Sequence, residues 1–368
     1  MNNRSNKKQK KIRRKTHKFY KRTESGVLFG GNADILAQAN DSASASASAS
    51  ASASASASAS TDGPSGGKRR KQRHSSISLK PMNCNPKAKQ QAIKNGSCLT
   101  EPALQKLKDS YNKEHPTNKI ISTDSPTIWS DLKSRMSTCS KEDCWLSVIK
   151  DPSQRNKLDN ELFAPDMPKE WKSKPNTWLS NFDIIAVLKQ YEESHSNFKV
   201  IGPTPIDFDT RPPDKNGKCV WEELCTFSLK RYLDEKKTKI GIVFNLDKHD
   251  QGGSHWVSLF LDLDHKFLFF LDSAGEKMPK EVKALVNRIV KQGDEIGITL
   301  TVYENYPTEH QMGNTECGVY SLFFIITMLT SEAEGKKFTN FMHKIKFFKE
   351  KKIPDKYVEK YRKIYFND

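Results

Sequence analysis

The sequence has 368 residues, room for about two domains, and a formal net charge of +17. Residues 1–75 hold sixteen Lys and Arg against four acidic residues, so +12 of that charge belongs to this segment and only +5 to the rest. There is no run of eighteen apolar residues, and no apolar core follows the basic N-terminus. We therefore expect neither a membrane-spanning helix nor a secretory signal.

Residues 1–80 are predicted to form a disordered basic tail. Ser and Ala alternate strictly over 42–60. Serine competes for backbone hydrogen bonds, and neither residue has a large apolar side chain to bury, so this stretch is expected to be a flexible linker. The positive charge of residues 1–75 makes nucleic acid an expected partner. The basic run at 68–73 is either a nuclear address or an ordinary solvated charge run.

Residues 81–150 are predicted to form a small helical accessory region. Thr100 has the character of an N-cap, with proline in the first turn, for a helix that runs to about residue 112. A second helix is expected over 125–136 and a third over 143–149. The polar stretch 151–174 follows as a connection to the next domain.

Seven cysteines, an odd number scattered over a long chain, predict reduced thiols in a cytosolic compartment. Four of them lie in the accessory region, at Cys84, Cys98, Cys139 and Cys144. They include no Cys-x-x-Cys pair, so a zinc site is not predicted. Cys219 and Cys225 flank an apolar turn and are expected to be inert core thiols.

Residues 170–368 are predicted to form an α+β domain. Helices are expected over 178–191 and 279–292, and a basic, aromatic helical region over 338–366. Strands are expected over 239–245, 255–263, 266–271 and 298–304. The middle two would form an antiparallel hairpin with a two-residue turn at Asp264-His265. Irregular alternation of helices and strands with one such hairpin is typical of the α+β class.

Cys317 lies where a polar, glycine-containing loop becomes an apolar run of about a dozen residues. This run is too short to cross a bilayer and long enough for a buried helix. The unpaired N–H groups and the positive dipole end of a helix start favour a thiolate. Gly318 leaves backbone N–H groups uncovered beside the sulfur, which suits a developing oxyanion. A buried structural cysteine is the alternative interpretation.

The hairpin predicts that a histidine and an aspartate meet near one end of the sheet. With a two-residue turn, His255 lies opposite Ala274 and Asp272 lies opposite Val257, so they are diagonal neighbours about 7–8 Å apart. A cysteine nucleophile needs a base, and the base needs an orienting group. Asp272 would hold one imidazole nitrogen and leave the other for Cys317. Each residue alone also has a structural explanation; their combination favours catalysis.

Two further features suit the same chemistry. Gln311 lies six residues before Cys317 in the same loop, and its amide could donate to an oxyanion. Gly252-Gly253, ahead of His255, would let a substrate backbone approach closely.

Four motifs together strongly resemble the ubiquitin-like-protein (SUMO) protease superfamily of cysteine peptidases. They are Gly253-Ser-His255-Trp256, Leu271-Asp272-Ser273, Gln311-Met-Gly-Asn-Thr-Glu-Cys317-Gly318 and Trp178-Leu-Ser-Asn181. The likeness is greatest to the virus-encoded branch that processes core proteins in nucleocytoplasmic large DNA viruses, and it covers roughly residue 178 to the C-terminus. It implies a papain-like or adenain-like fold with a central mixed sheet flanked by helices.

The resemblance also implies roles for individual residues. These are His255 as base, Asp272 as orienting group, Gln311 as oxyanion donor, Cys317 as nucleophile, and Trp178 and Trp256 as contacts to a Gly-Gly substrate backbone. Gly318, beside the nucleophile, is also expected to contact substrate. Core packing is the alternative role of the two tryptophans. Cellular deconjugases usually have Asn-Asp after Trp-Leu, whereas this chain has Ser180-Asn181. The missing acid argues against SUMO as substrate and fits a viral precursor.

The predicted function is a thiol endopeptidase that cleaves viral structural or core polyprotein precursors after small residues, in Gly-Gly-X-like segments. No metal or organic cofactor is required, and the virion and the host cytoplasm, at the virus factory, are the expected locations. Two alternatives stay open: an isopeptidase that removes ubiquitin-like modifiers, and a non-enzymatic virion protein that packages nucleic acid. Self-cleavage after Gly30-Gly31 or Gly66-Gly67 is a further hypothesis, with ordinary linker glycines as its alternative.

Overall fold

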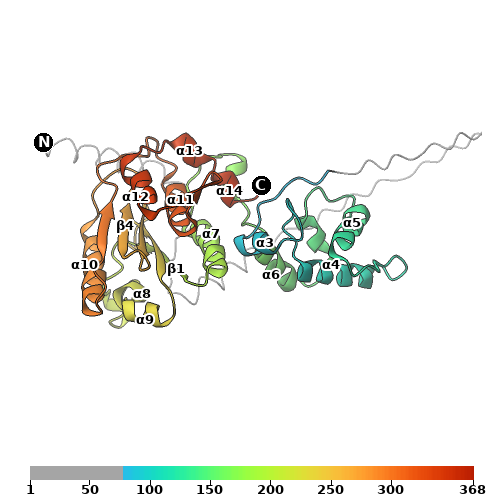
Figure 1. Ribbon diagram of the computed structural model, residues 1–368, viewed down its shortest axis with the longest axis horizontal. Coiled ribbons are helices and arrows are strands. Elements are labelled where there is room, and N and C mark those ends of the chain that lie inside the picture. Colours follow the sequence, from blue (N-terminus) through green and yellow to red (C-terminus); the bar gives the residue numbers. More distant parts are fainter. Residues whose placement is uncertain (1–77) are drawn as a thin grey trace, which may run out of the picture. The chain divides into compact units, whose positions relative to one another are not determined.

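Figure 1 shows the helices and strands of the computed structural model, which describes residues 78–368. The predicted tail of residues 1–80, with its linker at 42–60, lies outside the described residues except for its last three positions. In the part of the chain that is described, no helix has the length and apolar character needed to cross a membrane.

Five strands form one mixed sheet in the order β1-β2-β3-β4-β5. They are β1 Phe198–Pro205, β2 Lys239–Asn245, β3 Trp256–Asp262, β4 Phe267–Leu271 and β5 Thr301–Glu304. β3 pairs antiparallel with β2 and β4, whereas β1 and β5 are parallel to their neighbours. The three central strands are buried along almost their whole length, as in a sheet covered on both faces. The α+β prediction is confirmed.

The β3–β4 hairpin has the predicted register but a different turn. Its pairs run from Ser258–Leu271 to Asp262–Phe267, all in the register expected from the sequence. The turn is not the two residues Asp264-His265, because the ladder ends at Asp262 and four residues, 263–266, connect the strands. The Asp262 carboxylate accepts a hydrogen bond from the backbone N–H of His265 (3.1 Å), which holds this wider turn closed.

Helices cover the sheet on both sides. Helix α11, Cys317–Thr330, packs on β3, and α7, Asn181–Ser194, packs on β1 and on α11. In Figure 1 the sheet lies between this pair of helices and α10, Lys280–Glu295. All residues of α11 from Cys317 to Leu329 are buried. A helix buried on all sides needs no polar face, which explains its almost entirely apolar sequence.

The remaining predicted elements of this domain are also present, with small shifts at their ends. The helical C-terminal region consists of α12 Phe341–Glu350, α13 Asp355–Glu359 and α14 Arg362–Tyr365. The sequence pattern missed β1 and the short elements α8 Glu222–Cys225, α9 Leu229–Asp234, β6 Glu332–Ala333 and β7 Lys336–Lys337. β1 was not predicted because a glycine and two prolines interrupt its sequence. The other elements are too short to show a helix or strand periodicity.

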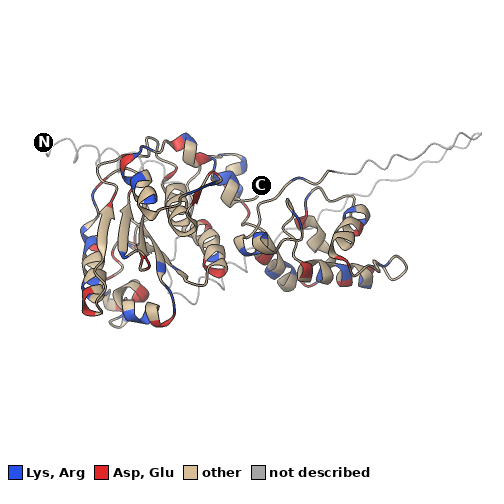
Figure 2. Ribbon diagram, viewed as in Figure 1, with Lys and Arg blue, Asp and Glu red and all other residues tan. Residues whose placement is uncertain are grey.

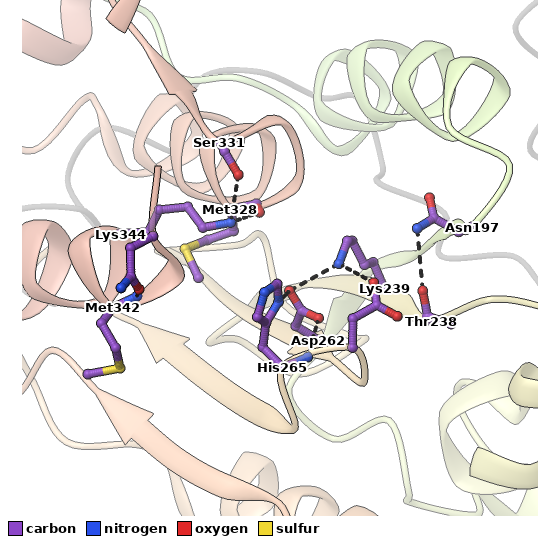
Figure 3. A network of polar contacts seen from close by, with 11 residues as sticks. Asn197, Thr238, Lys239, Asp262, His265, Met328, Ser331, Met342 and Lys344 are labelled. Atoms are coloured by element: carbon purple, nitrogen blue, oxygen red, sulfur yellow. Dashed lines mark hydrogen bonds and ion pairs between the residues drawn. The ribbon is translucent and has the colours of Figure 1, made fainter. Parts of the chain in front are cut away.

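Two groups of polar contacts lie near the turn end of the hairpin (Figure 3). Asp262 is fully buried, and its carboxylate contacts Lys239 Nζ (3.1 Å) and His265 Nδ1 (3.0 Å). Nearby, buried Lys344 donates to the Met328 carbonyl (2.8 Å), one of the last carbonyls of α11. Burial lowers the pKa of Lys344 to about 8. A cation here complements the negative end of the helix dipole.

The accessory region is helical, as predicted, and has a core of its own. Helices α4, Glu101–Glu114, and α5, Ser125–Arg135, begin after the N-caps Thr100 and Asp124, each with proline in the first turn. A 3₁₀ helix, η2 Asp143–Val148, takes the place of the third expected helix. Leu104, Leu107 and Trp145 are almost completely buried in this core.

The accessory region extends further than the predicted limit at residue 150. The stretch 151–174, expected to be a polar connection, begins with α6, Pro152–Leu162, whose Leu158 and Leu162 belong to the accessory core. Helix α3, Pro86–Gln91, was also missed. Both helices present few apolar residues, so no periodicity was visible. Asp151 followed by proline was the available signal for α6, the same N-cap pattern that revealed α4.

The expectation of reduced thiols is wrong for six of the seven cysteines. They form three disulfides, Cys84–Cys98, Cys139–Cys144 and Cys219–Cys225. In the folded chain the two Cα atoms of each pair lie between 5.1 and 6.3 Å apart. The spacing of the cysteines in the sequence does not reveal this proximity. Cys219 and Cys225 are therefore not free core thiols, and the four accessory cysteines form two separate pairs. Cys317 is the one free cysteine within residues 78–368.

Asn367, next to the C-terminus, joins the accessory region to the larger domain. Its Nδ2 donates to the carbonyls of Asn83 (3.0 Å) and Ala164 (2.9 Å), and its Oδ1 accepts from the Asn83 backbone N–H (2.8 Å). The side chain is buried, so water cannot replace these bonds.

Replacing Asn367 by Ala should lower the free energy of unfolding by roughly 1–3 kcal/mol, because backbone groups lose buried hydrogen-bond partners. Urea denaturation of the full chain measures this loss. Asp368→Ala is the matched control, since its exposed pair with Lys141 contributes little. Equal denaturation midpoints for the two variants would contradict the role given to Asn367.

Candidate active site

The predicted histidine and aspartate meet at the end of the hairpin away from its turn. His255 directly precedes β3 and Asp272 directly follows β4, so the observed register makes them neighbours across the strands. His255 Nε2 lies 2.7 Å from Asp272 Oδ1. Their side chains are only 15% and 4% exposed. A carboxylate can only accept, so Nε2 carries the proton and the free nitrogen of the ring is Nδ1.

Asn305 fixes the position of Asp272 and was not found from the sequence. Its Oδ1 accepts from the Asp272 backbone N–H (2.9 Å), and its Nδ2 donates to the Asp272 carbonyl (2.7 Å). Asn305 is fully buried just after β5, so the edge strand of the sheet holds the aspartate in place. The backbone N–H of Ala274 also donates to Asp272 Oδ1 (2.8 Å). The carboxylate therefore has a fixed orientation toward His255.

Cys317 is the first residue of α11 and contacts the imidazole of His255. Burial by itself would lower the pKa of His255. The charge and hydrogen bond of Asp272, together with the contact to Cys317, outweigh burial and raise this pKa well above its ordinary value. The imidazole is therefore a good proton acceptor for the thiol, and Asp272 stabilises the imidazolium that results.

Gln311 is hydrogen-bonded to Ser273, the residue that follows Asp272. Its side-chain Oε1 accepts from Ser273 Oγ (2.8 Å), and its backbone N–H donates to the Ser273 carbonyl (2.8 Å). Nε2 makes a longer contact, 3.3 Å, with the Gly313 carbonyl. Because Ser273 holds the amide oxygen, Nε2 is the end of the side chain that remains for an oxygen of a substrate.

The residues expected to contact substrate lie where β3, α7 and α11 meet. Trp256 is buried, and its Nε1 donates to the carbonyl of Leu179 (3.1 Å), the residue after half-buried Trp178. A Cβ on Gly318 would lie 3.1 Å from Leu179 Cβ and 3.3 Å from Trp256 Cδ1. Gly318 thus lets α11 pack closely on Trp256, and core packing accounts for most of the Trp256 surface.

Gly253, two residues before His255, has a local role as well. Gly253 has a φ of +84°, and a Cβ there would lie 2.9 Å from Asn245 Nδ2. Asn245 Oδ1 accepts from the backbone N–H of Ser254 (3.2 Å) and of Asp247 (3.0 Å). Glycine therefore allows the loop that leads into His255 to close over the end of β2.

No family model matches this chain. In sequence it is 29% identical, over 216 residues, to a protein of Acanthamoeba polyphaga mimivirus whose name describes a thiol protease; the match covers 57% of this chain and 64% of that protein. It is 28% identical over 244 residues to a cysteine protease of African swine fever virus, covering 60% of this chain and 87% of that protein. Proteins of further isolates of the same virus, named SUMO-1 cysteine proteases, match at 28% over 239 residues.

In structure the chain is similar to the crystal structure of an African swine fever virus protease. The TM-score is 0.53 at 20% sequence identity, and the superposition covers 79% of this chain and 97% of that one. The predicted resemblance to virus-encoded, SUMO-protease-like cysteine peptidases and the predicted fold are both confirmed. The chain spans less than two thirds of the mimivirus protein's length.

The electrostatic role of Asp272 can be tested on the imidazole itself. In a Cys317→Ala background the thiol no longer titrates beside His255. Adding Asp272→Asn there should move the pKa of His255 down and below the ordinary histidine range. The reason is that burial, which lowers this pKa, is then no longer opposed by the aspartate's charge. NMR titration of the histidine rings measures the change.

His265 serves as an internal control in the same spectra, because its partner Asp262 stays intact at the other end of the hairpin. A His255 titration that is unchanged by Asp272→Asn would show that the carboxylate does not control the imidazole.

Proposed function

We propose that this chain, a relative of the viral SUMO-protease-like cysteine peptidases in sequence and fold, is a thiol endopeptidase. The observation that carries the proposal is the contact between the one free cysteine of residues 78–368, Cys317, and an imidazole held by a buried aspartate. A thiol at a helix start, a base and an orienting group are the parts that nucleophilic catalysis requires.

The proposed reaction begins with transfer of the Cys317 proton to His255 Nδ1. The sulfur then attacks the scissile carbonyl carbon and forms a tetrahedral intermediate. Its oxyanion is stabilised by Gln311 Nε2 and by backbone N–H groups at the start of α11. His255 returns the proton to the leaving amine, and the acyl-enzyme remains. Water, deprotonated by His255, then releases the acyl group and restores the thiol.

We propose viral structural or core polyprotein precursors as substrates, cut after small residues in Gly-Gly-X-like segments. Support comes from the viral origin of the relatives. The cellular deconjugases usually have Asn-Asp after Trp-Leu, where this chain has Ser180-Asn181. Here Ser180 is the N-cap of α7 and forms a capping box with Asp183. The virion and the cytoplasmic virus factory are the proposed locations.

Two alternatives from the sequence keep specific support. The names of several relatives refer to SUMO, which favours an isopeptidase for ubiquitin-like modifiers. The packaging alternative depends on the charge of residues 1–75, which lie outside the described residues, so nucleic-acid binding there stays a prediction. An isopeptidase would release modifier from conjugates, and a packaging protein would cleave nothing, so the cleavage products distinguish both alternatives from the proposal.

Cys317→Ala and His255→Ala should each abolish peptide hydrolysis while the thermal unfolding midpoint changes little, since sulfur and imidazole act as one unit. The assay is release of a fluorophore from a peptide that ends in Gly-Gly. His265→Ala is the matched control, because it removes a histidine with an aspartate partner at the opposite end of the same hairpin. Wild-type turnover by Cys317→Ala would refute the assignment of the nucleophile.

Substrate class is tested by incubating active protein and Cys317→Ala with capsid and core precursors and mapping new N-termini by mass spectrometry. New termini after small residue pairs should appear with the active protein only. Release of modifier from conjugates without precursor cleavage would favour the isopeptidase instead. The same two preparations test self-cleavage, which requires termini at Asn32 or Lys68 in the active protein alone.

A further inference from the structure

Arg362, at the start of α14, reaches the residue that directly precedes the nucleophile. Its Nε donates to Glu316 Oε2 (2.8 Å) and one terminal nitrogen donates to Glu316 Oε1 (2.9 Å), a two-point contact to one carboxylate. That nitrogen also donates to the Thr315 carbonyl (3.0 Å). Both charged side chains are buried, with exposed fractions of 7% and 2%. A buried two-point pair of this kind has one geometry and resists rotation.

The same guanidinium also holds a second segment of the site. Its other terminal nitrogen donates to the carbonyl of Thr177 (2.9 Å), the residue before Trp178. The ring of Trp171 lies 4.4 Å from the guanidinium carbon and packs against it. One side chain therefore joins the segment that ends in Cys317 to the segment that leads into Trp178.

The rest of the loop before Cys317 is also attached to the C-terminal helices. The Asp355 carboxylate accepts from the backbone N–H groups of Met312 (3.0 Å) and Gly313 (2.7 Å). Buried His310, whose pKa burial lowers, accepts at Nδ1 from the Ile353 N–H (3.2 Å). These contacts fix the middle and the start of the loop. Arg362 alone among them contacts the residue adjacent to the nucleophile.

We propose that Arg362 is a positioning residue for the peptidase reaction: it holds Cys317 in line with His255 and keeps the Trp178 segment at a fixed distance from the sulfur. This inference rests on the proposed function. Lysine retains the positive charge but has one nitrogen, so it cannot hold Glu316, Thr315 and Thr177 together. Glu316→Gln keeps the shape of the partner and removes its charge.

The test compares Arg362→Lys and Glu316→Gln with the wild type in the full chain. A control is Arg288→Lys. Arg288, on α10, also makes a two-point contact to an aspartate, Asp209, and donates to the Leu224 carbonyl (2.8 Å). Measured quantities are kcat and KM for the Gly-Gly peptide, the rate of Cys317 alkylation by iodoacetamide across pH, and the thermal unfolding midpoint.

Arg362→Lys should reduce kcat about 100-fold, the order expected when a reacting group is misplaced by about 1 Å. Its alkylation rate at neutral pH should fall and the pH profile should shift at temperatures well below the unfolding midpoint of the variant, where the protein is fully folded. Glu316→Gln should show the same changes, and the double variant should be no worse than the single ones. Arg288→Lys should leave kcat and alkylation unchanged.

Normal kcat and a normal alkylation profile in Arg362→Lys would overturn the inference. So would a loss of activity that follows the fraction of unfolded protein, because that indicates a structural role only. Alkylation needs no substrate, so it separates the two proposals: if the wild type cleaves no peptide but Arg362→Lys still alters Cys317 reactivity, the peptidase assignment fails and the positioning role does not.

Discussion

The pairing of β3 with β4 determines where His255 and Asp272 lie. Side chains alternate between the faces of a strand, so a slip of one residue in this pairing would turn Asp272 away from His255. The register is held by a ladder of buried, mostly apolar residues from Ser258–Leu271 to Asp262–Phe267, so hydrophobic burial fixes a polar contact at the end of the sheet. Helix α11 packs on the same strand, which brings Cys317 to the imidazole.

The hairpin carries a histidine–aspartate pair at each end, and their surroundings give them different roles. At the turn, Asp262 is shared between His265 and Lys239, so a lysine supplies much of the positive charge that the buried carboxylate needs. At the other end, the Asp272 carboxylate accepts hydrogen bonds, within the described part of the chain, from the Ala274 backbone N–H and from His255. The charge of Asp272 therefore acts on the imidazole, and only this histidine has a cysteine beside it.

The loop that precedes Cys317 depends on the last part of the chain as well as on the sheet. The loop from His310 to Cys317 is attached at several points to the helices between Phe341 and Tyr365. A few residues further on, Asn367 is bound between two segments of the accessory region. The fold thus stabilises a short loop with contacts from segments that are distant in sequence. Preorganisation of this kind reduces the reorganisation that a reaction requires.

The sequence by itself determined the features that depend on near neighbours. The apolar run of α11, the cap at Thr100 and the alternation that set the hairpin register involve residues a few positions apart, so their patterns predicted the elements and the meeting of His255 with Asp272. Only the tertiary structure decided the contacts between distant segments. Asn305 lies 33 residues from Asp272 and Arg362 lies 46 from Glu316. No local pattern encodes such pairs, because they form only when packing of the whole core brings their backbones together.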